Sequence, residues 1–160
     1  MLYLIRGVPG KGKTTYAKSL ECLAVEADHW NVRNGKYDYD HTRVAAAHEW
    51  CFEQAKAAID RGMDIAIVNT FAHLKFLIPY VEYARARGCP VTIVECWYKG
   101  KTQHPVPDKV IAVMLQTWED IPAEWLPEVN LVFPYGKRHQ KKRNAHDLFQ
   151  VGENSEGGWA

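Results

Sequence analysis

A chain of 160 residues is about the length of one domain, and 47% hydrophobic with 24% charged residues is ordinary for a globular protein. The net charge of +1 excludes a strong overall attraction to nucleic acid, and no apolar run approaches the roughly 20 residues that span a bilayer. The segment 1–6 runs straight into a glycine-rich loop, so we expect no signal peptide, no membrane partner and a cytoplasmic location.

The four cysteines lie far apart in the sequence, at Cys22, Cys51, Cys89 and Cys96. They lack the short paired spacing of zinc sites, and an even count alone is weak support for disulfides. We expect reduced thiols in the core.

The amino-terminal part begins with two short apolar runs. Residues 1–6 and 22–27 are typical of buried strands, and a helical pattern from Lys13 to about Leu20 lies between them. The polar residues 29–41 predict a loop, with a turn at Asn34-Gly35.

The middle of the chain repeats this alternation with longer helices. We expect a helix from an N-cap at Thr42 to about Arg61, a buried strand at 65–68, a helix at about 73–87 and a strand at 91–96.

Further on, Pro107 is expected in the first turn of a helix that reaches about Thr117, and residues 129–133 could form a last strand. The succession of strands and helices predicts an α/β fold with a mainly parallel sheet.

The loop after the first strand fits the pattern G-x-x-x-x-G-K-[ST]. In this pattern backbone N–H groups and a helix N-terminus bind polyphosphate, the lysine contacts the outer phosphates, and the hydroxyl ligates Mg²⁺. A coincidental glycine turn is the alternative, but a strand precedes the loop and a helix follows it, as the motif requires. The expected nucleotide-binding residues are Gly7, Val8, Pro9, Gly10, Lys11, Gly12, Lys13, Thr14 and Thr15.

Two missing signals narrow the class of P-loop protein. No Asn-Lys-x-Asp segment is present to read guanine, and the strand 65–68 ends in Asn69-Thr70 rather than in acidic residues. Small-molecule and nucleic-acid kinases remain. The predicted fold is the three-layer α/β/α fold of P-loop NTPases.

Ligands of open parallel sheets bind at the carboxyl ends of the strands, where Asp28, Asn69 and Thr70 are expected. Asp28 is a candidate catalytic base, with a place in the magnesium shell or a helix cap as alternatives. Asn69 and Thr70 could hold the attacking group or a metal-bound water, or could simply end a strand. His48 and Trp50 are expected to form a packed, hydrogen-bonded pair on the long helix, with a functional site as the alternative.

The segment 98–107 carries Lys99, Lys101 and His104 directly after a strand. We expect a lid that adds positive charge over the phosphates, with a charged surface loop as the alternative.

At this point the residues resemble a known family: P-loop kinases that include the 5′-hydroxyl kinase domain of phage polynucleotide kinase and related AAA-type ATP-binding kinase domains. The resemblance spans roughly residues 2–122. It rests on the segments GVPGKGKTT at 7–15, AD at 27–28, AHEW at 47–50, VNT at 68–70, PY at 79–80 and HPVP at 104–107.

The resemblance implies that Lys13 and Thr14 bind ATP and Mg²⁺, that Asp28 activates the 5′-hydroxyl of the acceptor, and that the segment before Pro107 is the lid. Three positions depart from the family. Asn31, with Arg33 nearby, stands where an arginine holds the acceptor's phosphate, and Asn69 replaces an acid. The lid offers lysines, which lack the planar bidentate grip of arginine on phosphate.

The leading hypothesis is therefore an ATP-dependent kinase acting on the 5′-hydroxyl of a polynucleotide. A nucleoside or nucleoside monophosphate kinase and a non-catalytic nucleotide-binding protein are the alternatives. Residues 1–135 are expected to form the kinase domain and 136–160 a basic, then flexible tail; its run 137–143 carries five Lys and Arg residues that could contact nucleic acid.

Overall fold

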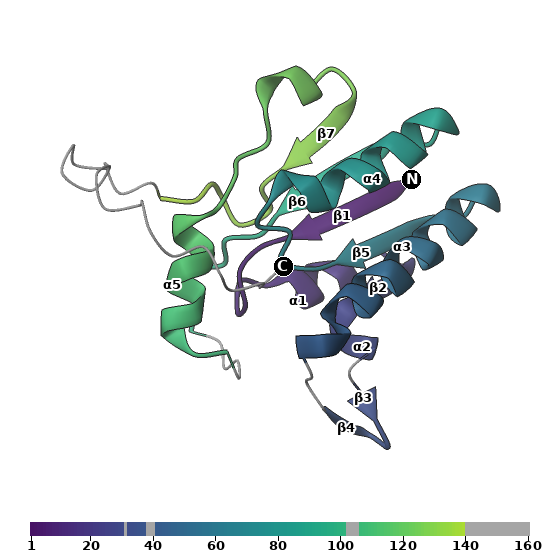
Figure 1. Cartoon of the computed structure of the whole chain (residues 1–160). Coiled ribbons are helices and arrows are strands. Elements are labelled where there is room, and N and C mark those ends of the chain that lie inside the picture. Colours follow the sequence, from purple (N-terminus) through teal and green to yellow (C-terminus); the bar gives the residue numbers. More distant parts are fainter. Residues whose placement is uncertain (31, 38–40, 102–105, 140–160) are drawn as a thin grey trace.

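A five-stranded sheet forms the centre of the molecule (Figure 1). The computed structural model describes residues 1–30, 32–37, 41–101 and 106–139. Every paired strand of this sheet runs parallel to its neighbour. In spatial order the strands are β2 (Leu23–Glu26), β5 (Ile65–Val68), β1 (Leu2–Arg6), β6 (Val91–Glu95) and β7 (Val129–Val132).

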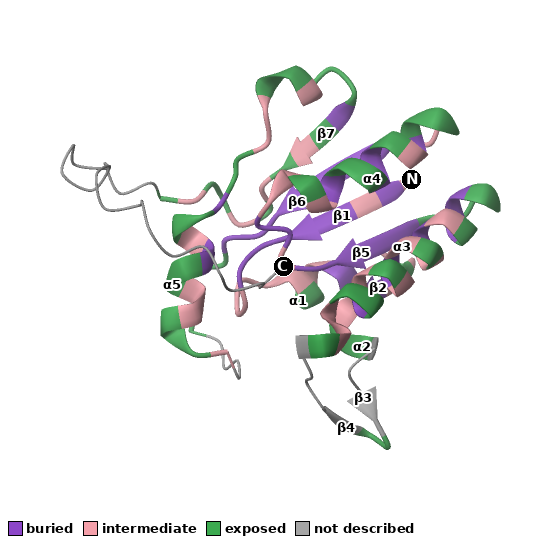
Figure 2. Cartoon of the chain, viewed as in Figure 1, coloured by how far each residue is buried: buried purple, intermediate pink, exposed green. Residues whose placement is uncertain are grey.

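Strand β1 lies in the middle of the sheet, and its register aligns the carboxyl ends of the strands along one edge. Leu4 is level with Ile67 of β5 and with Ile93 of β6. All residues of β5 and β6 are buried, as expected for central strands of a parallel sheet covered on both faces (Figure 2). The polar residues that follow these strands therefore meet at the same edge.

Helices cover both faces of the sheet, which confirms the predicted three-layer fold. On one face α1 (Lys13–Lys18) places Ala17 in a cluster with Ile5 and Val94. On the other face α3 (Val44–Asp60) and α4 (Leu74–Ala86) pack on Leu2 and Leu4. A further helix, α5 (Asp108–Gln116), lies at the carboxyl edge, and the short turn η2 (Ala123–Trp125) precedes β7 (Figure 1).

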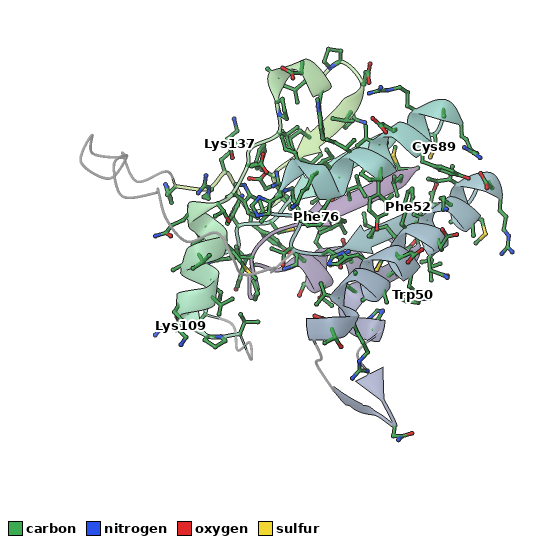
Figure 3. The ribbon with its side chains drawn as sticks, in the orientation of Figure 1. Trp50, Phe52, Phe76, Cys89, Lys109 and Lys137 are labelled. Carbon is green, nitrogen blue, oxygen red and sulfur yellow. The ribbon has the colours of Figure 1, made fainter. Side chains whose placement is uncertain are left out.

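Aromatic side chains join α3 to α4 (Figure 3). Phe52 meets the ring of Tyr80 edge-on at 5.1 Å between centroids, and His48 stacks on Phe76 at 5.8 Å. Trp50 packs against the same core cluster. His48 and Trp50 are thus both packed residues of α3.

The expectation of a plain loop at 29–41 was wrong in part. The short helix α2 (Ala27–Trp30) follows β2, and β3 (Val32–Arg33) pairs antiparallel with β4 (Lys36–Tyr37). The turn at Asn34-Gly35 is present, with φ of 52° and 74°. Both residues are left-handed, as the tight turns of two-residue hairpins require, so this signal indicated a hairpin.

Two predicted helix starts shift by one or two residues. A 3₁₀ turn, η1 (His41–Arg43), contains Thr42, and Arg43 is the N-cap residue of α3 without a side-chain cap. Thr42 is therefore not the N-cap, because the turn already commits its backbone to a helical path. Pro107 is likewise the N-cap residue of α5 and lies just before its first turn.

The four cysteines are free, as expected. Cys51 and Cys96 are fully buried, and burial raises the pKa of each thiol to about 11. Cys22 and Cys89 are only half-buried, so they lie at the margin of the core. Across the described parts of the chain, no helix is long and apolar enough to cross a membrane.

Candidate nucleotide site

The phosphate loop leaves β1 at Gly7, where only a glycine fits. A Cβ atom at this position would lie 2.7 Å from the carbonyl oxygen of Cys96. The amide of Gly7 donates to the carbonyl of Thr70 at 3.2 Å, which joins the loop to the segment after β5. The first glycine of the motif therefore permits close contact between two backbones.

Gly12, at the other end of the loop, is the N-cap residue of α1 and has a φ of 88°. A Cβ atom here would lie 2.8 Å from the ring of Tyr135, whose hydroxyl donates to the Gly12 carbonyl at 3.3 Å. The ring of Tyr98 meets that of Tyr135 at 5.5 Å between centroids. Tyr135 thus packs against the loop, and Tyr98, whose amide donates to the Lys11 carbonyl at 3.2 Å, packs against Tyr135. The sequence placed Tyr98 in the predicted lid but did not connect Tyr135 with the phosphate loop.

Lys13 folds back over the loop. Its ammonium donates to the carbonyl of Val8 at 3.1 Å. Burial lowers the pKa of Lys13 to about 8, although the carboxylates of Glu26 and Asp28 act in the opposite direction. The cation is held against the backbone of the loop, where the outer phosphates of a nucleotide are expected.

Thr14 reveals a site residue that sequence analysis missed. Its hydroxyl donates to Oε1 of Glu26 at 3.0 Å. Glu26 is the last residue of β2, so a carboxylate lies at the carboxyl edge directly beside the hydroxyl predicted to ligate magnesium. The clue in the sequence is the single acid, Glu26, inside the otherwise apolar run 22–27.

These oxygens fit a magnesium ion. Hydroxyl and carboxylate groups are the hard ligands that Mg²⁺ prefers, and in kinase sites the substrate phosphates complete its shell. In the described part of the chain, no group of three or more His, Cys, Asp or Glu residues is placed to hold a metal without a ligand's help. The arrangement suits an ion that arrives with the nucleotide.

Asp28 lies in α2, two residues beyond Glu26, and is exposed. Its charge raises the pKa of Lys13 and also that of His48, whose net pKa shift is downward because burial outweighs the carboxylate. Asp28 is therefore within electrostatic range of both the phosphate loop and α3. Asp28 thus lies just beyond the carboxyl end of β2, where the sequence predicts it, and its role as a base stays a prediction.

Asn69 connects β5 to α2. It is buried, and its Oδ1 accepts the amide of Ala27 at 2.9 Å. The side chain thus has at least one structural function next to Asp28, and Thr70 offers its carbonyl to Gly7.

The structure describes only some of the remaining predicted site residues. Lys99 and Lys101 are exposed in the segment after β6. Arg33 belongs to β3, at the distal hairpin (Figure 1). Asn31 and His104 lie outside the described residues, as do residues 140–160 of the predicted tail.

The parallel sheet and the glycine loop between β1 and α1 together define a nucleotide-binding protein of the P-loop kinase-like class. Over residues 2–119 the chain matches the family described as AAA domain, and it belongs to that family. This match confirms the broad part of the resemblance; the link to phage polynucleotide kinase is finer and stays a prediction.

One relative is the human NEDD4-binding protein 2, which is 29% identical over 134 residues. The match covers 74% of this chain but only 8% of that protein, so the chain spans less than a tenth of its relative.

Among solved structures, a sugar kinase from Janibacter sp. aligns with a TM-score of 0.57 at 16% identity, covering 82% of this chain and 83% of that one. Kti12 from Chaetomium thermophilum, solved with ADP-AlF3, aligns with a TM-score of 0.52 at 13% identity, covering 83% and 88%. At these identities the likeness concerns the fold alone.

Proposed function

We propose that the protein is an ATP-dependent kinase that transfers the terminal phosphate to the 5′-hydroxyl of a polynucleotide. The observation that carries this proposal is the convergence of Lys13, Thr14, Glu26 and Asp28 at one end of the sheet. A cation for phosphate, oxygens for a metal and an exposed acid for the acceptor are the components that phosphoryl transfer needs.

On the donor side, the loop amides and Lys13 bind the β- and γ-phosphates of ATP. Bound Mg²⁺ would neutralise charge on these phosphates, with Thr14 as a ligand and Glu26 orienting the Thr14 hydroxyl. Because Lys13 already lies against the Val8 carbonyl, it needs little rearrangement to contact a phosphate.

On the acceptor side, Asp28 accepts the proton of the attacking hydroxyl. Its exposure leaves the end of a long acceptor free to approach, whereas an enclosed carboxylate would favour a small molecule. Asn69 fixes the amide of Ala27, the residue before this base. Lys137, which begins the basic run, is exposed and offers a cation to a phosphate backbone (Figure 3), whereas the next residue, Arg138, pairs with Asp120 at 3.8 Å.

The test offers labelled ATP and Mg²⁺ with a 5′-hydroxyl oligonucleotide, nucleosides and nucleoside monophosphates in parallel. We expect label on the oligonucleotide, in both DNA and RNA versions of the assay or in one of them. Label found only on mononucleotides would instead identify a nucleoside or nucleotide kinase. Tight ATP binding without transfer to any of these acceptors would support a non-catalytic nucleotide-binding protein.

A further inference from the structure

Arg6, the last residue of β1, is a charged side chain buried in the core directly before the phosphate loop. It is 0% exposed. Its guanidinium donates to the carbonyl of Phe71 from Nε at 3.1 Å and from Nη2 at 2.8 Å. Nη2 also donates to the carbonyls of Ala72 at 3.3 Å and Glu119 at 2.8 Å. One side chain thus joins β1 to the segment after β5 and to the residues after α5.

Phe71 has an unusual backbone where Arg6 contacts it. Its φ is 48°, in the left-handed region that residues other than glycine rarely adopt. Its ring is buried and meets Tyr80 at 5.7 Å between centroids, so the residue cannot relax outward without leaving the core. Two donors on the Phe71 carbonyl hold this conformation in place.

The segment 69–72 touches both halves of the candidate site. The carbonyl of Thr70 accepts the amide of Gly7 in the phosphate loop at 3.2 Å. The side chain of Asn69 accepts the amide of Ala27, next to Asp28, at 2.9 Å. The conformation that Arg6 holds at Phe71 therefore fixes residues that bridge the nucleotide loop and the proposed base.

The same guanidinium reaches the end of α5. Its Cζ atom lies 4.0 Å from the centroid of Trp118, and the amide of Glu119 donates to the Ala72 carbonyl at 2.9 Å. Trp118 and Met114 share a core cluster with Val8 of the phosphate loop. A displacement of the phosphate loop would therefore act on α5 both through this packing and through Arg6.

We propose that Arg6 is a positioning residue that holds the segment 69–72 and the end of α5 in register with the phosphate loop, so that nucleotide binding orders the acceptor side. The changes in KM and kcat predicted below rest on the kinase activity proposed above. The predicted change in amide hydrogen exchange requires only that the protein binds a nucleotide. Arg6 touches neither substrate, and it acts through Phe71, Ala72 and Glu119.

Lysine cannot take over this function. Glu95 accepts from Arg6 at 3.3 Å and from the indole of Trp97 at 2.7 Å, which provides the buried charge with a counter-ion. A lysine would keep that charge but has a single nitrogen, whereas the planar guanidinium serves acceptors on several sides at once. The variant Arg6→Lys therefore keeps the positive charge but loses the set of hydrogen bonds that the guanidinium makes.

The experiment measures amide hydrogen exchange with and without a slowly hydrolysed ATP analogue, in wild type, in Arg6→Lys and in Arg85→Lys. Arg85 is exposed on α4 and pairs with Glu128 on the surface, so it controls for the chemical change. In wild type and in the control, the analogue should slow exchange at Glu119 and at 69–72 by about tenfold. In Arg6→Lys this slowing should fall below about twofold, while the slowing across the loop 7–15 persists.

Steady-state kinetics of Arg6→Lys provide a second test. In Arg6→Lys the KM of the acceptor should rise and kcat should fall, each by about tenfold, with ATP affinity changed by less than about threefold. A wild type that phosphorylates no acceptor but shows the exchange pattern would overturn the proposed function and leave the role of Arg6 standing.

Three results would overturn the role of Arg6. One is full analogue-induced slowing at Glu119 in Arg6→Lys. Another is a parallel loss of ATP affinity, transfer and thermal stability, which indicates a purely structural residue. If Arg6→Lys does not fold, the exchange measurement on the wild type tests the proposal. An analogue that binds without slowing exchange at Glu119 contradicts the proposal, and slowing at Glu119 supports it.

Discussion

The donor and acceptor halves of the candidate site are built in different ways. The donor half is a single continuous segment, residues 7–15, in which an added Cβ atom would lie 2.7 Å from a backbone oxygen at Gly7 and 2.8 Å from an aromatic ring at Gly12. The acceptor half gathers Asp28 from α2 and Asn69 from the end of β5, and Glu26 at the end of β2 contacts Thr14 of the donor half from outside its continuous segment. A contiguous motif is specified by local sequence, whereas an assembled site depends on which strands pair and in which register.

This difference predicts that damage to the donor half removes all activity, and Lys13→Ala should have the largest effect. We expect transfer to fall by about a thousandfold, because the variant loses the cation that meets the developing phosphate charge. Lys18→Ala, an exposed lysine on the same helix, is the matched control. Radiolabel transfer under saturating ATP measures both, and a Lys13→Ala protein with near-normal rates would remove the lysine from the mechanism.

Gly12→Ala should weaken ATP binding by about tenfold or more, since the new methyl group displaces Tyr135 and the residue keeps a left-handed φ. Gly88→Ala shares the positive φ but has open space around it. Calorimetric titration with ATP compares the two variants. Equal affinities would mean that contact between Tyr135 and the loop has no importance for binding.

The affinity for ATP should decline with rising pH. Phosphate favours the charged form of Lys13, so binding raises a pKa that is about 8 in the free protein. The contribution of Lys13 to ATP binding is fully present below the pKa of the free protein and is lost as the pH rises above it. ATP should therefore bind about tenfold more weakly at pH 9 than at pH 7. Titrations in buffers of different ionisation enthalpy should show proton uptake near pH 8.5. A flat profile across this range argues against contact between Lys13 and the nucleotide.

At the proposed metal site beside Thr14, Glu26→Gln should have a smaller effect than loss of the base. Glutamine still accepts the Thr14 hydrogen bond but removes a charge, so we expect a several-fold higher Mg²⁺ requirement and a rate loss of about tenfold. Magnesium titrations of nucleotide binding provide the measurement. Glu21→Gln, an exposed acid before β2, controls for net charge, and an identical Mg²⁺ dependence in both variants would exclude Glu26 from the metal site.

Much of the fold and of the donor half could be predicted from the sequence, for identifiable reasons. The strands Ile65–Val68 and Val91–Glu95 are short, mostly apolar segments, and both are fully buried. Gly88, with a φ of 63°, follows the last turn of α4, where a glycine typically ends a helix. The glycines of the phosphate loop allow the backbone conformation that the loop adopts. These features depend on local spacing alone.

Other features escaped prediction because they depend on tertiary contacts. Glu26 and Arg6 each lie in a mostly apolar run, and their partners, Thr14 for Glu26 and Phe71 and Glu119 for Arg6, come from other segments of the chain. Tyr135 reaches Gly12 from 123 residues away, a contact that no local pattern encodes. The hairpin at 32–37 has strands of two residues each, too short for a periodic pattern.

The division into two halves is tested most directly by Asp28→Asn, with ATP affinity and transfer to a 5′-hydroxyl oligonucleotide measured on the same preparation. Glu49→Gln, an exposed acid on α3, is the control. We predict ATP affinity within about twofold of wild type and transfer reduced by about a hundredfold or more, because only the acceptor half loses its base. Undiminished transfer, or a loss of ATP binding that matches the loss of transfer, would contradict this account.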